Sequence, residues 1–137
     1  MRGVAVVGCV LAWSVCAEPP VLHRFVCIDN AKGARLLYVD QFNPSNSWTR
    51  PVSAASRSLQ RVEGGRILVG FDTGFAEYIL KNGDEAARLA GYQRISAAAR
   101  MPDGSTWLAG HSSSGVVVYV VGRDLRAHGA PRLVYPE

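Results

Sequence analysis

The sequence has little lysine and few charged residues of any kind. Charged residues make up 19% of the 137 residues, and only two of the 15 basic residues are lysines, Lys32 and Lys81. The arginines are scattered, with no run of four or more, so the dense basic patch typical of nucleic-acid binding is absent. We therefore interpret the net charge of +4 as a solubilising surface and expect no nucleic-acid partner.

Clustered metal ligands are also lacking. The histidines are far apart and have no spacing such as His-x-x-x-His: His23, His111 and His128. Four aspartates fall in separate segments and form no continuous calcium loop: Asp29, Asp40, Asp72 and Asp103. We expect neither a metal nor a cofactor. A hydrophobic content of 48% excludes a disordered chain, and the length allows one ordinary domain.

The N-terminus has the three-part pattern of a secretory signal peptide. Arg2 supplies a positive charge, Gly3 to Val15 is uncharged and mostly apolar, and short side chains at Val15-Cys16-Ala17 suit a signal peptidase. The apolar run is shorter than the roughly 20 residues that span a bilayer. We expect cleavage near Ala17, export to the periplasm or the extracellular space, and a mature chain, residues 18–137, that does not span a membrane.

Removal of this peptide leaves one cysteine. Cys9 and Cys16 belong to residues 1–17, and only Cys27 remains in the mature chain. A single cysteine cannot form an internal disulfide, so the exported domain must be stabilised by its core alone.

Short apolar runs alternate with turn residues along the mature chain. Phe25–Ile28 precedes Asp29-Asn30, Ile67–Val69 precedes Asp72-Thr73-Gly74, and Val116–Val121 precedes Gly122-Arg123-Asp124. Gly, Asn and Asp tolerate the positive φ values that tight hairpins need. Helical periodicity is confined to one short stretch, Asp84–Leu89. The pattern predicts an all-β fold.

A repeat of about 40 residues organises these strands. Tyr38, Tyr78 and Tyr119 are 40 and 41 residues apart, each inside an apolar strand. Before the second and third tyrosines, the segments Arg61–Gly70 and Arg100–Gly110 share the order strand, turn ending in Gly, apolar strand, Gly. A period of this length with several strands in each unit is typical of propeller blades.

The repeat segments resemble exported bacterial β-propeller proteins, relatives of the NHL and pyrroloquinoline-quinone-type propellers. The resemblance covers nearly all of residues 22–121 and rests on these segments: Leu37–Gln41 with Trp48, Ser56–Gln60, Glu77-Tyr78 and Arg100–Leu108. It implies antiparallel four-stranded blades with a Pro-Asp-Gly turn between the first two strands. It implies no chemistry, and the quinone is not carried over because none of its binding residues can be matched.

Three blades fit the chain, at about 22–51, 52–90 and 91–137. The first begins at its second strand, because few mature residues precede Arg24. Propellers close with typically four to eight blades, so three predict an incomplete ring with unpaired edges. We expect either missing C-terminal blades in a truncated reading frame, the preferred interpretation, or a protomer that completes its ring as an oligomer.

An enzyme is the alternative interpretation. Asp72-Thr73-Gly74 follows an apolar strand and resembles the active-site loop of aspartic proteases, and Val120–Leu125 resembles a later segment of the retroviral type. Such short chains act as homodimers in which two aspartates share a proton. However, Phe75 follows where a small residue is preferred, and the repeat explains Asp72 as turn chemistry.

We therefore favour a binding or scaffolding role over catalysis, with an unidentified ligand or protein partner. Loops at one end of the blades are the expected recognition surface, and their tips are the candidate binding residues: Asp29, Asn30, Asp72, Thr73, His111 and Ser112.

Overall fold

The computed structural model describes residues 20–31, 33–126 and 129–136, and the predicted signal peptide at residues 1–17 lies outside them. The regular secondary structure of the described chain is β-strand, apart from one 3-10 turn, Pro44–Asn46. The strands are β1 (Arg24–Asp29), β2 (Arg35–Asp40), β3 (Trp48–Pro51), β4 (Ser56–Val62), β5 (Arg66–Phe71), β6 (Gly74–Ile79), β7 (Glu85–Ala90), β8 (Ile95–Arg100), β9 (Thr106–Ser112), β10 (Gly115–Val121) and β11 (Arg132–Pro136). The predicted all-β class is confirmed.

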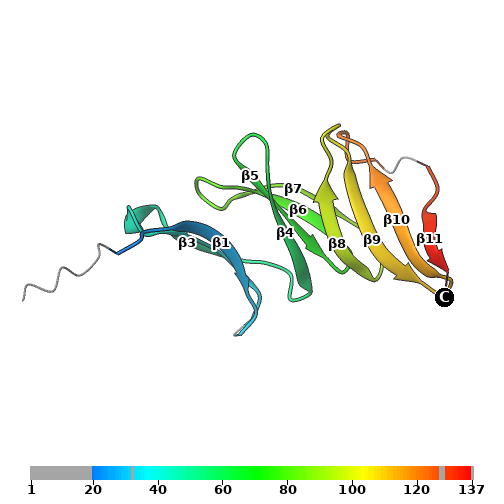
Figure 1. The fold of residues 1–137 in the computed structure, drawn as a ribbon, viewed down its shortest axis with the longest axis horizontal. Coiled ribbons are helices and arrows are strands. Elements are labelled where there is room, and N and C mark those ends of the chain that lie inside the picture. Colours follow the sequence, from blue (N-terminus) through cyan, green and yellow to red (C-terminus); the bar gives the residue numbers. More distant parts are fainter. Residues whose placement is uncertain (1–19, 32, 127–128, 137) are drawn as a thin grey trace, which may run out of the picture.

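Three antiparallel sheets follow one another along the chain (Figure 1). We call them the first sheet (β1–β3), the middle sheet (β4–β7) and the last sheet (β8–β11). Every strand pairs with its neighbour in sequence, so each sheet is a simple meander. The first sheet has three strands and the other two have four.

The stretch with helical periodicity is a strand. Glu85–Ala90 forms β7, which pairs with β6 from Gly74↔Ala90 to Tyr78↔Glu85. Burial alternates along β7, and Leu89 packs against a core cluster. Tertiary pairing therefore overrides a weak local preference. Among the described residues, none lies in a helix with the length and apolarity needed to cross a membrane.

The repeated tyrosines occupy equivalent positions. Tyr38, Tyr78 and Tyr119 lie in β2, β6 and β10, opposite an apolar residue of the preceding strand in each case: Val26, Ile67 and Leu108. Successive side chains of a strand point to opposite faces. Each sheet therefore has a tyrosine face, which carries this pair, and an opposite face.

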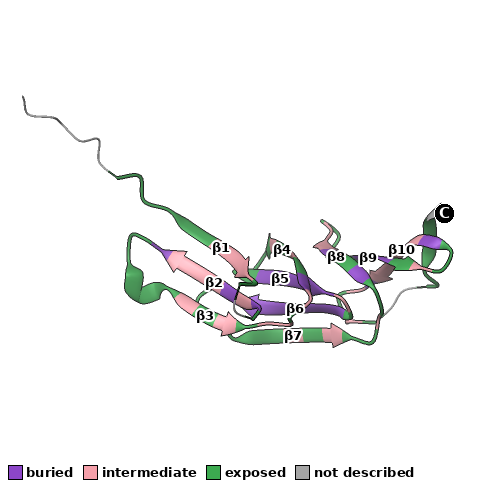
Figure 2. Ribbon diagram, turned by 90° about the horizontal axis from the view of Figure 1, so that it is seen from below, coloured by how far each residue is buried: buried purple, intermediate pink, exposed green. Residues whose placement is uncertain are grey.

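The middle sheet is covered on both faces. Ile67, Val69 and Tyr78 of its tyrosine face belong to one core cluster, whereas Leu68 and Phe75 of its opposite face belong to another. Burial is consequently continuous along β5 and β6, the purple strands of Figure 2, but alternates along β4. This explains why the apolar runs of β5 and β6 lack the period-two pattern of a half-exposed strand.

The last sheet stacks closely on the middle sheet (Figure 1). Leu108 and Val121, on the tyrosine face of the last sheet, pack with Leu68 and Phe75. Small residues permit the close approach: a Cβ built on Gly70 would lie 2.3 Å from Ser58 Oγ and 2.9 Å from Ala98 Cβ.

The first sheet uses its tyrosine face as well. Val26, Ile28 and Leu36 pack against Ile67 and Phe71 of the middle sheet. Trp48 Nε1 donates to the Leu80 carbonyl oxygen at 2.9 Å, and Arg50 Nη2 donates to that of Asn82 at 2.8 Å. The first sheet thus meets the β6–β7 turn of the middle sheet.

Candidate binding groove

A groove of about 710 Å³ lies at the junction of the middle and last sheets. It is bordered by two turns between the first and second strands of their sheets, at residues 63–65 and 101–105. Val62, Met101 and Pro102 supply apolar wall. Because arginine dominates the charged lining, we call it the arginine groove; its charged residues are Arg61, Glu63, Arg66, Glu77, Arg100 and Arg123.

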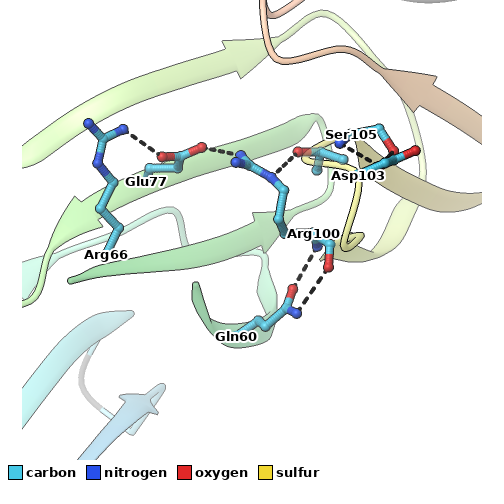
Figure 3. A network of polar contacts seen from close by, with 7 residues as sticks. Gln60, Arg66, Glu77, Arg100, Asp103 and Ser105 are labelled. Atoms are coloured by element: carbon cyan, nitrogen blue, oxygen red, sulfur yellow. Dashed lines mark hydrogen bonds and ion pairs between the residues drawn. The ribbon is translucent and has the colours of Figure 1, made fainter. Parts of the chain in front are cut away.

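A buried carboxylate lies at the wall of the groove (Figure 3). The side chain of Glu77, in β6, is only 5% exposed. Its Oε2 accepts from Arg66 Nη1 of the same sheet at 3.0 Å, and its Oε1 accepts from Arg100 Nη2 of the last sheet. Arg100 is fixed in turn by Nε, which donates to Thr106 Oγ1 at 2.9 Å. A carboxylate with little exposure thus joins two sheets, with a guanidinium on each side.

The two arginines determine the protonation of Glu77. Burial alone would raise the pKa of its carboxyl, but the hydrogen bonds and charges of Arg66 and Arg100 outweigh burial and lower the pKa below its ordinary value. Glu77 is therefore a fixed anion at neutral pH. It is poorly suited to exchange protons with a substrate, since a general acid or base works best with a pKa near the working pH.

Side chains of β4 bind the backbone of β8. Gln60 Oε1 accepts from the Arg100 N–H at 2.6 Å, while Gln60 Nε2 donates to the Arg100 carbonyl oxygen at 3.2 Å. Ser58 Oγ accepts from the Ala98 N–H at 2.9 Å and donates to the Ala98 carbonyl oxygen at 3.4 Å. Both pairs are 40 residues apart, so these bonds fix the register of one sheet on the next.

The far side of the groove is the Pro-Asp-Gly turn. Asp103 Oδ1 accepts from the backbone N–H of Ser105 at 2.8 Å and from its hydroxyl at 2.6 Å, as Figure 3 shows. These bonds, together with the charge of Arg123, lower the pKa of the Asp103 carboxyl. Arg123 Nε donates to the Asp103 carbonyl oxygen at 3.1 Å, and its guanidinium lies where a Cβ of Gly104 would be. Gly104 also has φ +84°, a backbone conformation that favours glycine, and a Cβ here would displace the Arg123 guanidinium.

The sequence-predicted binding residues lie at the other end of the strands. Asp72 and Thr73 form the two-residue tip between β5 and β6, and their carbonyl oxygens accept from Ile95 N–H at 2.9 Å and Tyr92 N–H at 3.1 Å. His111 and Ser112 lie inside β9, because the tip of that hairpin is residues 113–114. The His111 N–H donates to the Arg94 carbonyl oxygen at 3.1 Å. The structure thus brings Asp72, Thr73 and His111 to one connector, Tyr92–Ile95.

Asp29 and Asn30 belong to the first sheet alone. Asp29 ends β1, and its carboxylate accepts from the Ala31 N–H and from Arg35, which lowers its pKa. Asn30 follows it and is exposed. Within the described residues, no hydrogen bond or ion pair joins these two residues to Asp72, Thr73 or His111.

Sequence reasoning missed the arginine groove, although one signal was present. Glu77 interrupts the apolar segment Phe75–Ile79, and a glutamate is almost never buried without a partner. That position marks an ion pair. Its partner Arg100 is 23 residues distant and belongs to another sheet, so spacing could not identify it.

No known protein family, curated protein or solved structure matches this chain. Within the part of the chain that the structure describes, no three His, Cys, Asp or Glu side chains gather as a metal site would require. The candidate function therefore depends on the geometry of the groove.

Proposed function

We propose that the chain is an exported β-propeller-like binding protein that holds its ligand in the arginine groove and performs no reaction there. One observation carries the binding role: an open cavity of about 710 Å³ is lined by polar side chains that converge from two sheets. A concave site with a few fixed polar groups and some apolar wall is the usual form of a ligand site.

The contacts at the groove support binding over catalysis. Its buried carboxylate is neutralised by Arg66 and Arg100, which hold it ionised. Fixed donors and acceptors of this kind orient a ligand without supplying a nucleophile or a proton.

Two further features support a propeller-like arrangement of the middle and last sheets, a stacking that the first sheet does not repeat. Each sheet is a meander with its tyrosine in the equivalent strand, and the last sheet stacks on the middle sheet through contacts between residues 40 apart. Stacked four-stranded meanders at this period are the units of a propeller. Export rests on the sequence of residues 1–17.

A steric block of the groove tests the binding role whatever the chemistry of the ligand. Residues 18–137 are screened by thermal shift against sugars, amines, carboxylates, phosphates and short peptides, alongside a Met101→Trp variant that fills the groove and an Ala86→Trp control on the exposed edge strand β7. We expect at least one probe to stabilise the wild type and the control but not Met101→Trp. If no probe stabilises the wild type, or if Met101→Trp responds equally, the groove is not the binding site.

Export is tested by sequencing the N-terminus of the product released from the cell. The expected product begins at Glu18. A product that keeps Met1 to Ala17 contradicts export by a cleaved signal peptide.

A further inference from the structure

We infer that the ligand of the arginine groove is a small oxyanion, with a carboxylate or phosphate group bound by Arg66, Arg100 and Arg123. This inference rests on the binding role proposed above and adds the chemical class of the ligand.

The lining of the groove carries an excess of positive charge. Four arginines and two glutamates line the groove, and two of the arginines share the single carboxylate of Glu77. Asp103, next to the lining, interacts with the charge of Arg123 and offsets part of it. With Asp103 included, four arginines still face only three carboxylates. The groove therefore keeps uncancelled positive charge, which favours an anionic guest.

The arginines of the groove have more N–H donors than their contacts within the protein use. A guanidinium carries five N–H donors in a planar fork that matches carboxylate and phosphate oxygens. Arg66 donates to Glu77 through one nitrogen, and its side chain is 48% exposed. Arg123 donates through Nε to the Asp103 carbonyl oxygen. Both arginines line the groove, Arg66 from the middle sheet and Arg123 from the last sheet.

Arg100 is already ordered by contacts within the protein. The guanidinium of Arg100 is fixed by Glu77 and Thr106, and its backbone N–H by Gln60, so the side chain is held in place before a ligand arrives. A fixed donor costs less conformational entropy on binding than a mobile surface arginine. Met101, Pro102 and Val62 add apolar contact for the non-ionic part of a guest.

Calorimetry with two oxyanions and two controls tests the inference. The probes are citrate, inorganic phosphate, neutral glucose and the cation spermine, each titrated into residues 18–137 at low salt. We expect citrate or phosphate to bind and the other two not to bind. Preference for citrate identifies a carboxylate ligand, and preference for phosphate identifies a phosphorylated one. Affinity is expected to fall as sodium chloride is added.

Charge-matched variants separate the groove from net charge. Arg123→Gln and Arg66→Gln should each weaken the anion about tenfold, as expected for loss of one charge-assisted contact. Arg57→Gln removes the same charge from an exposed position of β4 outside the groove and should leave affinity within about twofold. Circular dichroism confirms that each variant is folded. If Arg66→Gln does not fold, the affinity of Arg123→Gln alone tests whether the groove binds the anion.

The outcomes that overturn the inference differ from those that overturn the binding role. Equal weakening by Arg57→Gln and Arg123→Gln contradicts an oxyanion site in the groove. Binding of glucose or spermine that Met101→Trp abolishes, without binding of either anion, contradicts the ligand class and leaves the binding role intact. Failure of every probe in both assays contradicts both.

Discussion

The two contacts between sheets differ, although the sheets themselves repeat. The last sheet presents its tyrosine face to the opposite face of the middle sheet, whereas the first sheet presents its tyrosine face to the tyrosine face of the middle sheet. Side chains of β4 bind the β8 backbone at one contact, and Trp48 and Arg50 reach a turn at the other. The three sheets therefore share a meander topology, and their stacking depends on contacts specific to each pair.

This difference bears on how copies of the chain would associate. The two outward faces are both opposite faces: Phe25, 44% exposed, lies on that of the first sheet, and Trp107, 43% exposed, lies on that of the last. A ring made by repeating the contact of the middle and last sheets needs a free tyrosine face at one end. The described sheets leave none, so identical copies could not close a ring through that contact alone.

The largest loss of stability is expected from a larger side chain at the contact between the middle and last sheets. Gly70→Val would drive a branched side chain into Ser58 and Ala98, and we expect a loss of about 3 kcal/mol in the free energy of unfolding. Urea denaturation measures it. Ala109→Val, on the outward face of the last sheet, is the matched control and should cost less than about 0.5 kcal/mol. Equal losses would show that the close approach is unimportant.

The second largest loss of stability is expected from the buried ion pairs of Glu77 with Arg66 and Arg100, at the same contact between sheets. Glu77→Gln leaves Arg66 and Arg100 facing an uncharged amide in a site with little exposure, so unfolding should become easier by about 2 kcal/mol at pH 7. Its counterpart at the other contact is Asp84→Asn, which removes the exposed ion pair with Arg50 and should change stability by less than about 0.5 kcal/mol. If Glu77→Gln lowers the free energy of unfolding less than Asp84→Asn does, the buried ion pairs of Glu77 are not the stronger contribution.

The contribution of Glu77 to stability depends on pH. Its pKa is lowered in the folded chain from an ordinary value of 4.5, so the unfolded chain binds the proton more tightly. The stabilisation is thus complete above pH 4.5 and is lost as the pH falls through the lower, folded-state pKa. We expect wild type and Glu77→Gln to converge in urea midpoint on acidification. A difference in urea midpoint that grows as the pH falls would contradict the lowered pKa of Glu77.

A smaller loss of stability is expected at the contact between the first and middle sheets. Trp48→Phe keeps an aromatic ring but removes the N–H that donates to the Leu80 carbonyl oxygen, at a cost of about 1 kcal/mol. Amide hydrogen exchange should quicken in β1–β3 and stay unchanged in β8–β11. Thr49→Val, outside this contact on β3, serves as the control. Uniform quickening would mean that the three sheets unfold as one unit.

The smallest effect is expected at the hairpin tip that resembles a protease loop. Asp72 contributes its backbone carbonyl to the Ile95 contact, and Gly74 has φ +155° with a Cβ position only 2.0 Å from the Leu89 carbonyl oxygen. Asp72→Asn keeps both features and should leave stability within about 0.5 kcal/mol. We expect no pepstatin-sensitive peptide cleavage at acidic pH from either protein. Cleavage that Asp72→Asn abolishes would establish the protease alternative.

Local chemistry explains how much of this fold could be predicted from sequence. Short apolar runs bounded by Gly, Asn and Asp predict strands and hairpins, and turns such as Asp72-Thr73 are found between the strands expected. The offset of Tyr38, Tyr78 and Tyr119 identified equivalent strands because one register recurs in each sheet. These features depend on residues close in sequence or on a fixed period.

The arginine groove, and which face of each sheet is buried, depend neither on residues close in sequence nor on a fixed period. Arg100 meets Glu77 and Gln60 only once the last sheet has stacked, and those contacts span 23 and 40 residues. The first sheet buries Leu36 and Val26, yet its alternation fits burial of either face, because Phe25 and Leu37 on the other side are also apolar. Alternation identifies two faces without selecting the partner of each.

The bonds from Ser58 and Gln60 have a consequence for solubility. A strand at the margin of a sheet offers unpaired N–H and carbonyl groups on which a foreign strand can assemble, the first step toward aggregation. The side-chain amide of Gln60 bonds both the N–H and the carbonyl oxygen of Arg100 in β8, as the peptide group of a neighbouring strand would. The hydroxyl of Ser58 bonds the same two groups of Ala98. Ser58 and Gln60 thereby occupy backbone groups at the β8 margin of the last sheet and deny them to strands of other chains.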